Sequence, residues 1–139
     1  MEEEILKAVD FLKKGKVILY PTDTIWGIGY DATVSKAVER IYRIKQRVES
    51  KSMIVLLDQP DKLGRYVKNV PDVAYDLIER YQEPLTIIYR DAMNVSRNVI
   101  ADDGSLAIRI VKDAFCREMI SRLGRPVVST SANLSGQAS

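Results

Sequence analysis

Histidine is absent from the 139-residue sequence, and cysteine occurs once, as Cys116. Without histidine the chain can form neither a Ser-His-Asp triad nor a Cys-His dyad, and no histidine can act as a metal ligand or general base. A single cysteine excludes an internal disulfide and a cysteine-based zinc site. Any chemistry must therefore rest on the other polar and charged side chains and on backbone groups.

Long apolar runs are also lacking. No stretch approaches the roughly 20 apolar residues needed to span a bilayer, and the start of the chain, Met1 to Glu4, is acidic and unlike a signal peptide. We therefore expect a cytoplasmic protein with no membrane partner. A composition of 46% hydrophobic and 29% charged residues suits one globular core. We expect a single domain over residues 1–139.

The spacing of apolar residues predicts an α/β domain. Helical periodicity predicts helices over residues 4–14, 35–45, 72–82 and 113–123. Short apolar runs predict strands over residues 17–20, 53–57, 85–89, 106–111 and 127–128. Residues 21–29 between them are predicted to be a loop. Because strands alternate with helices along most of the chain, we expect a sheet covered by helices.

Positive charge is concentrated in one short segment. The formal net charge of +2 is too small to indicate a nucleic-acid partner by itself. Five cations nevertheless fall within residues 40–51: Arg40, Arg43, Lys45, Arg47 and Lys51. Such a segment can clamp a triphosphate, with Arg as a planar fork and Lys as a point charge. The alternative is an ordinary helix end, where cations are favourable in any case. The Walker A spacing is absent.

Two segments rich in hydroxyl groups follow predicted strands. Residues 21–29 contain Thr22, Thr24 and two glycines, and residues 129–136 contain several serines and Asn133. Polar side chains at strand ends of an α/β sheet commonly contact ligands. The structural alternatives are a plain strand–turn–strand connection for the first and a helix-capping loop for the second.

Arg109 lies inside a predicted strand. Leu106, Ile108 and Ile110 should share one face of that strand, which leaves Ala107 and Arg109 on the other. A charge in this position is commonly a solvated residue. It can also receive a carboxylate if its face lines a pocket.

These segments together, in this order, resemble the YrdC/Sua5 family of L-threonylcarbamoyladenylate synthases. The matching stretches are residues 20–29, 44–47 with 51–53, 83–86, 104–109 and 129–136. The resemblance implies a YrdC/RibB-like fold, which is a twisted mixed α/β sheet covered by helices with a concave, positively charged cavity. Because short family members continue past this point, it also implies that the domain is truncated at its C-terminus.

The resemblance further implies an enzyme that joins L-threonine, bicarbonate and ATP into threonylcarbamoyl-AMP and releases pyrophosphate, with Mg²⁺ accompanying ATP. A partner enzyme would then transfer the threonylcarbamoyl group to tRNA, giving N6-threonylcarbamoyladenosine (t6A). The implied ATP-binding residues are Lys45, Arg47, Lys51, Ser52, Thr86, Ser131 and Asn133. Among these, the implied catalytic residues are Lys45, Arg47, Ser131 and Asn133. Thr24 and Arg109 would bind threonine, with Arg109 contacting its carboxylate.

Two other functions are compatible with parts of this pattern. The first is a tRNA- or double-stranded-RNA-binding module without catalysis, which would use the basic segment at residues 40–51. No ladder of aromatic residues accompanies that segment, which favours the enzyme. The second is a carbamoyl-transfer domain of the kind found in hydrogenase-maturation proteins. Those chains carry cysteine-rich zinc segments, and this sequence has none.

Overall fold

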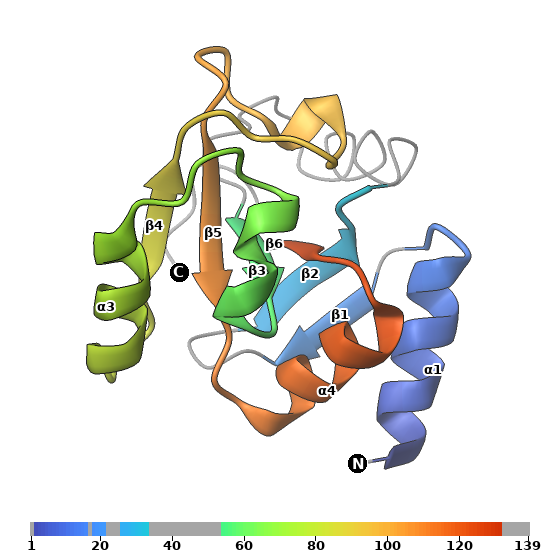
Figure 1. The fold of residues 1–139 in the computed structure, drawn as a ribbon. Helices are drawn as coiled ribbons and strands as arrows, with labels where there is room; N and C mark the ends of the chain where they lie inside the picture. The colour runs from blue at the N-terminus through green and yellow to red at the C-terminus, as the bar shows by residue number, and fades with distance from the viewer. Residues whose placement is uncertain (1, 17, 22–25, 34–53, 132–139) are drawn as a thin grey trace.

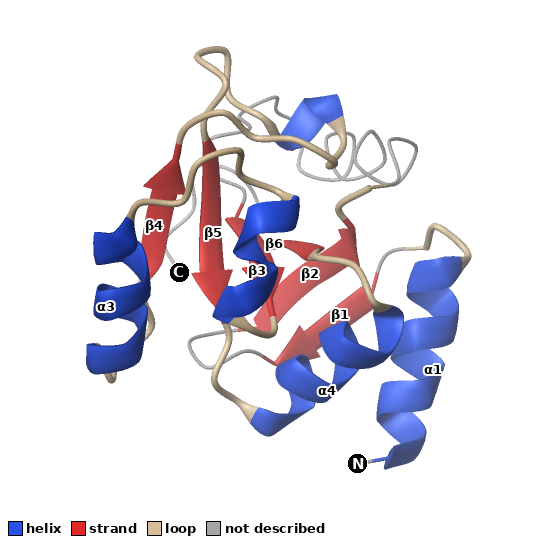
Figure 2. Ribbon diagram, viewed as in Figure 1, coloured by secondary structure: helices blue, strands red, loops and turns tan. Residues whose placement is uncertain are grey.

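The computed structural model describes residues 2–16, 18–21, 26–33 and 54–131. In this part of the chain six strands form one sheet in the order β1-β2-β6-β3-β5-β4, drawn in Figures 1 and 2. The strands are β1 (Ile18–Pro21), β2 (Trp26–Asp31), β3 (Ile54–Leu57), β4 (Thr86–Tyr89), β5 (Leu106–Ile110) and β6 (Val127–Ser131). Strands β3 and β5 are parallel, and the other neighbours are antiparallel. The predicted mixed α/β sheet is confirmed.

The helices of the described residues agree with the predicted ones. They are α1 (Glu2–Lys13), α3 (Asp72–Arg80) and α4 (Ala114–Leu123), with 3₁₀ turns η2 (Pro60–Arg65) and η3 (Arg97–Val99). Helix α1 ends before Gly15 and α4 before Gly124, whose φ angles of 74° and 75° are ones that glycine adopts without strain. Asp113 caps α4 by accepting a hydrogen bond from the Cys116 amide at 3.0 Å. The helix predicted over residues 35–45 lies outside the described residues.

One predicted loop is wrong in the structure. Residues 21–29 contain the start of β2, which runs from Trp26 and pairs with β1 on one side and β6 on the other. Gly27 and Gly29 lower the strand propensity of this segment, so its sequence resembles a loop. Pairing along both edges outweighs that local preference.

The last strand is also longer than predicted. β6 continues from Val127 through Ser131, so the first three residues of the segment at 129–136 are strand residues rather than loop residues. Here too, pairing with neighbouring strands outweighs a weak local strand propensity, because β6 lies between β2 and β3. The strands predicted over residues 53–57, 85–89 and 106–111 are confirmed within one residue at each described end.

Two hydrophobic clusters cover the two faces of the sheet. Alternate residues of β3 divide between them: Leu56 packs with α1 and α4, whereas Val55 and Leu57 pack with η2 and α3. In Figure 1, α1 and α4 lie side by side near β1, and α3 lies beside β4 at the other end of the sheet. Among the described helices, α1 and α4 therefore cover this face at the β1 end and not at the β4 end.

Helix α1 contributes four buried residues to its cluster, as its periodicity predicts: Ile5, Ala8, Val9 and Leu12. Helix α3 is less buried. Ala74 alone among its residues is fully buried, and Val73 and Leu77 remain 61% and 45% exposed. Among the described helices none has the length and apolar character needed to cross a membrane.

Replacing Leu12 with Ala tests the α1–α4 packing. Leu12 is 0% exposed, so Leu12→Ala should lower the free energy of unfolding by about 2–5 kcal/mol through lost burial and a residual cavity. Leu6→Ala on the same helix is the matched control. Leu6 is 52% exposed, and its replacement should change stability by no more than about 0.5 kcal/mol. Equal losses in urea denaturation would contradict this packing.

Candidate functional site

Three of the predicted site segments adjoin the same edge of the sheet. Thr24 lies in the connection between Pro21 and Trp26, which are cross-strand partners at the ends of β1 and β2. The basic segment leads into Ile54 at the start of β3. Asn133 follows Ser131 at the end of β6. Strand pairing therefore places the flanks of these three segments at one edge of the sheet, although the first and last segments are more than a hundred positions apart in the sequence.

The register shows how close these strand ends are. Ser131 pairs with Gly27 of β2, and Ser129 pairs with Gly29 of β2 and with Ile54 of β3. Directly paired residues on antiparallel strands have Cα atoms about 4.5–5.5 Å apart. The ends of β1, β2, β6 and β3 thus form one continuous rim, which we call the site edge. Its described members are Pro21, Trp26, Gly27, Ile54, Ser129 and Ser131.

Most of the predicted nucleotide-binding residues lie outside the described part of the chain. These are Lys45, Arg47, Lys51, Ser52 and Asn133, together with Thr24 from the predicted threonine site. Ser131 is described as the last residue of β6. Thr86 and Arg109 are described with their side chains. The structure therefore shows Thr86 and Arg109 in contact. It places Ser131 near the described residues that flank Thr24 and the basic segment at residues 40–51.

Arg109 lies on the α1–α4 face of the sheet, beyond the end that the two helices cover. It pairs with Leu56 of β3 on one side and with Thr86 of β4 on the other. Residues opposite one another on neighbouring strands share a face, and Leu56 belongs to the α1–α4 cluster. The Nε–H group of Arg109 donates a hydrogen bond to Thr86 Oγ1 at 3.0 Å. The predicted alternation along β5 is confirmed, because Leu106 and Ile108 are buried on the opposite face.

The sheet face around Arg109 is open in the described part of the chain. Ile88, two residues after Thr86 on the same face of β4, is 71% exposed. Ala107, which pairs with Ile88, is only partly buried. In the described residues, this part of the face therefore carries an exposed apolar side chain close to Arg109 and Thr86.

The far end of β2 carries a buried acid that sequence analysis missed. Asp31 is 0% exposed, and its carboxylate accepts hydrogen bonds from Arg125 Nη1 at 2.9 Å and from the amide and hydroxyl of Thr33 at 2.9 and 2.7 Å. An Asp followed two residues later by Thr at a strand end is the available signal, since this spacing favours an Asx turn. The contacts tie the end of β2 to the start of β6 and leave this carboxylate fully occupied.

Two buried tyrosines lie on the opposite face and cannot serve as bases at neutral pH. Burial raises the pKa of the Tyr89 phenol to about 12, and burial also raises the pKa of Tyr66 above its ordinary value. Both side chains belong to the cluster beneath η2 and α3. Both phenols therefore stay protonated at neutral pH.

A surface hollow of about 270 Å³ lies away from the site edge. Its lining residues are Asp58, Gln59, Ala114, Arg117, Glu118 and Ser121. Asp58 follows the carboxyl end of β3, whereas the site edge includes the opposite end of that strand. Lys62 Nζ already contacts Asp58 Oδ2 at 2.7 Å. The hollow is therefore separate from the site edge.

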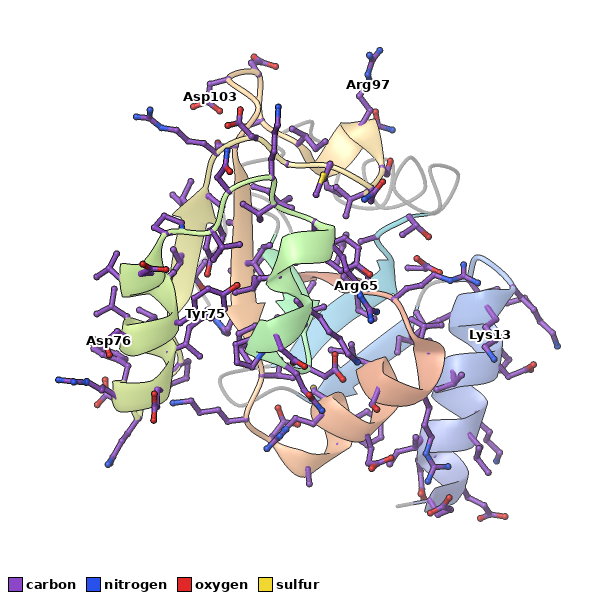
Figure 3. All side chains as sticks on the ribbon, in the orientation of Figure 1. Lys13, Arg65, Tyr75, Asp76, Arg97 and Asp103 are labelled. Atoms are coloured by element: carbon purple, nitrogen blue, oxygen red, sulfur yellow. The ribbon has the colours of Figure 1, made fainter. Side chains whose placement is uncertain are left out.

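The loops at the end of the sheet that carries the site edge are polar. The connection from β4 to β5 crosses this end, and Figure 3 shows Arg97 and Asp103 projecting from it. Among the described residues, no group of three or more His, Cys, Asp or Glu side chains could hold a metal ion. The described members of the site edge thus offer the Ser129 hydroxyl and backbone groups, and Arg97 lies in the neighbouring connection.

A comparison with known protein families shows to which family the chain belongs. The sequence matches the Sua5/YciO/YrdC family, described as telomere recombination, over residues 10–139. The chain belongs to the Sua5/YciO/YrdC family. The resemblance seen in the sequence motifs is confirmed.

Relatives within this family share the whole length of the chain. A protein of Pseudoalteromonas translucida named threonylcarbamoyl-AMP synthase is 34% identical over 139 residues, which cover 98% of this chain and 74% of the relative. A protein of Escherichia coli K12 with the same name is 32% identical over 137 residues, which cover 96% of this chain and 72% of the relative.

A solved structure of this family has the same fold. The P. abyssi Sua5 structure complexed with L-threonine superposes with a TM-score of 0.91 at 29% sequence identity. The similarity covers 100% of this chain, which spans 41% of the P. abyssi chain. The fold of the described strands and helices is therefore that of a Sua5 protein.

The same substitution at two isoleucines tests whether the sheet face around Arg109 is open. Ile88→Thr should change the free energy of unfolding by no more than about 0.5 kcal/mol, because Ile88 is 71% exposed. Ile108→Thr on the neighbouring strand should cost about 2–4 kcal/mol, because Ile108 is 2% exposed. Both changes keep a β-branched side chain. A large loss for Ile88→Thr in chemical denaturation would show that the face is covered.

Proposed function

We propose that this chain is a threonylcarbamoyl-AMP synthase that joins L-threonine, bicarbonate and ATP and releases pyrophosphate. The observation that carries the proposal is the 34% identity to a protein of that name over 98% of this chain. The reaction class would be nucleotidyl transfer, because an adenylyl group moves from ATP to a carbamate oxygen. This chemistry needs placement and charge stabilisation rather than a histidine base, which suits a sequence without histidine.

In this proposal Arg109 binds the carboxylate of L-threonine. A guanidinium on an otherwise exposed sheet face, next to a hydroxyl and an apolar side chain, suits an amino acid ligand. The P. abyssi relative is known as a complex with L-threonine, which supports an amino acid as the substrate. Thr24 would contact the same ligand from the connection between β1 and β2.

The nucleotide would be bound at the site edge. We assign its phosphates to Lys45 and Arg47, with Lys51 and Ser52 nearby. Ser131 and Asn133 would complete the phosphate site from the end of β6. Thr86, which pairs with Arg109 from the β4 side, would be a further ATP contact. The support is topological: β6 pairs with β3, whose first described residue directly follows the basic segment.

The reaction would proceed in two steps. The amine of threonine combines with bicarbonate to give a carbamate and water. A carbamate oxygen then attacks the α-phosphorus of ATP, the bond to the bridging oxygen breaks, and pyrophosphate leaves with the electron pair. Lys45 and Arg47 would stabilise the negative charge that develops on the phosphate oxygens. Arg109 would hold the threonine in line for this attack. Holding the reacting groups in this geometry would accelerate the reaction.

Mg²⁺ would enter with ATP. It prefers oxygen ligands and usually keeps several waters in nucleotide sites. The chain's hydroxyl and amide groups near the end of β6, Ser131 and Asn133, are of the right chemical kind to contact its water shell. The metal would neutralise part of the phosphate charge when bound.

The product would be used by a tRNA threonylcarbamoyl-transfer enzyme, so the chain would act in t6A formation in the cytoplasm. Binding of tRNA or other RNA by this chain is a further part of the proposal, and the basic residues 40–51 would supply the phosphate contacts. An RNA-binding module without catalysis is not favoured, since the named relatives are synthases.

A substrate-omission experiment tests the proposed reaction. Pyrophosphate release from ATP should require both L-threonine and bicarbonate, because the attacking group is the carbamate that these two form together. Release would be measured with a coupled phosphate assay, with reactions lacking each substrate in turn. Release at the same rate without threonine would contradict the proposal.

The phosphate clamp is tested by removing one cation. Lys45→Ala should lower the rate of pyrophosphate release by about 100-fold, because it removes a charge from the proposed transition-state contacts. The unfolding midpoint should stay unchanged. Lys13→Ala is the control, since Lys13 is an exposed lysine on α1 (Figure 3). If both variants keep wild-type activity, Lys45 has no part in the chemistry.

A further inference from the structure

Exposed apolar side chains gather at the β4 end of the molecule. Among the described residues seven large apolar side chains are exposed, and five of them lie between residues 73 and 88. Four of these five belong to α3 and its C-terminal boundary: Val73, Tyr75, Leu77 and Tyr81. Single exposed apolar residues are ordinary on a protein surface, whereas a concentration of them on one element marks an interaction site.

Three of these side chains form a line along α3, which we call the α3 ridge: Val73, Leu77 and Tyr81. They are 61%, 45% and 46% exposed. Residues four positions apart lie one above the other on a helix. The Tyr81 amide donates a hydrogen bond to the Leu77 carbonyl at 2.9 Å, so the helical backbone reaches the last residue of the ridge. Rows of this kind are the ridges by which helices pack into the grooves of other helices.

The domain itself uses little of the apolar surface of α3. Ala74 is the buried residue of this helix, and Ile78 is partly buried against the same cluster. Pro71, at the position before α3, provides no side-chain hydrogen bond to cap it. A helix of nine residues with little packing and no cap is weakly stabilised. A partner that covers the α3 ridge would therefore stabilise α3 as it binds.

The surroundings of the α3 ridge are acidic. Residues 72–83 contain four acids and one cation, in a chain whose net charge is +2. The cation, Arg80, contacts Asp76 on the same helix at 3.4 Å, and Figure 3 shows Asp76 on the side of α3 that faces away from the sheet. The other three acids are also exposed: Asp72, Glu79 and Glu83. An apolar ridge beside negative charge is complementary to an apolar surface flanked by positive charge.

We propose that the α3 ridge docks an amphipathic helix of another protein, whose apolar face is flanked by lysine or arginine. The four-residue spacing of the ridge indicates a helix as the partner element, and the acidic surroundings indicate its charge. A second copy of this chain fits less well. A symmetric contact between two copies of α3 would place acids against acids, which is unfavourable.

The position of the α3 ridge separates this interaction from the proposed chemistry. Helix α3 packs on the face of the sheet that carries Val55 and Leu57, whereas Arg109 shares the opposite face with Leu56. A partner on α3 would therefore leave the face around Arg109 unobstructed. The inference does not rest on the proposed function, because the exposure and charge of α3 are the same whatever Arg109 binds.

Fluorescence titration of the full chain with synthetic peptides tests this inference. The probe is a labelled peptide of about 18 residues in which leucines recur at helical spacing and the other positions are lysine. One comparison peptide has glutamate in place of lysine, and another has the same leucines and lysines in an order without helical spacing. The leucine–lysine helix should bind about tenfold more tightly than either comparison peptide. Its affinity should fall as the salt concentration rises.

Three variants locate the binding surface. Leu77→Gln removes the centre of the α3 ridge and should raise the Kd for the leucine–lysine helix by about tenfold. Leu6→Gln is the matched control, because Leu6 is a leucine of similar exposure, 52%, on α1. Its Kd should stay within about twofold of wild type. Glu79→Lys should weaken binding of the leucine–lysine helix and strengthen binding of the leucine–glutamate helix. Leu77→Ala replaces the glutamine variant if circular dichroism shows that Leu77→Gln does not fold.

Hydrogen exchange and sedimentation complete the test. The amides of α3 should become more protected when the leucine–lysine helix is added. The inference is overturned if this peptide does not bind, if Leu77→Gln binds it as tightly as wild type, if the comparison peptides bind equally well, or if protection in α3 is unchanged. It is also overturned if the wild-type chain sediments as a dimer that Leu77→Gln converts to a monomer, since a second copy would then cover the ridge.

Discussion

Strand β6 pairs with β2 along one edge and with β3 along the other, and the position of the proposed site depends on this double pairing. The three strands come from the beginning, the middle and the end of the chain. Their register places Ser129 opposite both Gly29 and Ile54. Val127 and Val128 are both buried and pack in different clusters, so β6 is covered on both faces at these positions. A slip of β6 by one residue would exchange the side chains that face each cluster.

The parallel pair β3–β5 extends this arrangement to Arg109. The pairing of Arg109 with Leu56 places the guanidinium on the face that α1 and α4 cover farther along the sheet. Helix α3 covers only the opposite face. The described helices thus leave the part of the sheet around Thr86 and Ile88 uncovered on the α1–α4 face. A fold that buried both faces evenly would have no such surface to offer a ligand.

The three helices of the described residues could be predicted from the sequence because their signals are local. The apolar spacing of Ile5, Ala8, Val9 and Leu12 defines the buried face of α1, and the glycines after α1 and α4 mark the helix ends. The strand beginning at Trp26 and the extension of β6 to Ser131 depend on pairing with distant strands. Glycine and serine have weak strand preferences of their own, so those boundaries could not be read from the segments themselves.

The site residues divide in a similar way. Arg109 was identified from its alternation within an apolar strand, and its face is the one that alternation predicts. Its contact with Thr86 was not predicted, because the two residues are 23 positions apart and the pairing needs the β4–β5 register. Asp31 was missed for another reason: its partner Arg125 is 94 positions away. The roles of Lys45, Arg47, Lys51, Ser52, Asn133 and Thr24 stay predictions from the sequence.

In the proposed function, the sheet face around Arg109, beside the edge formed by β1, β2, β6 and β3, binds the amino acid substrate. A crystal structure of the chain with L-threonine and a non-hydrolysable ATP analogue tests this most directly. The account predicts the threonine carboxylate within about 3 Å of the Arg109 Nη atoms, with the triphosphate at the site edge. Threonine bound on the opposite face, or its carboxylate held by other residues with Arg109 pointing to solvent, would contradict it.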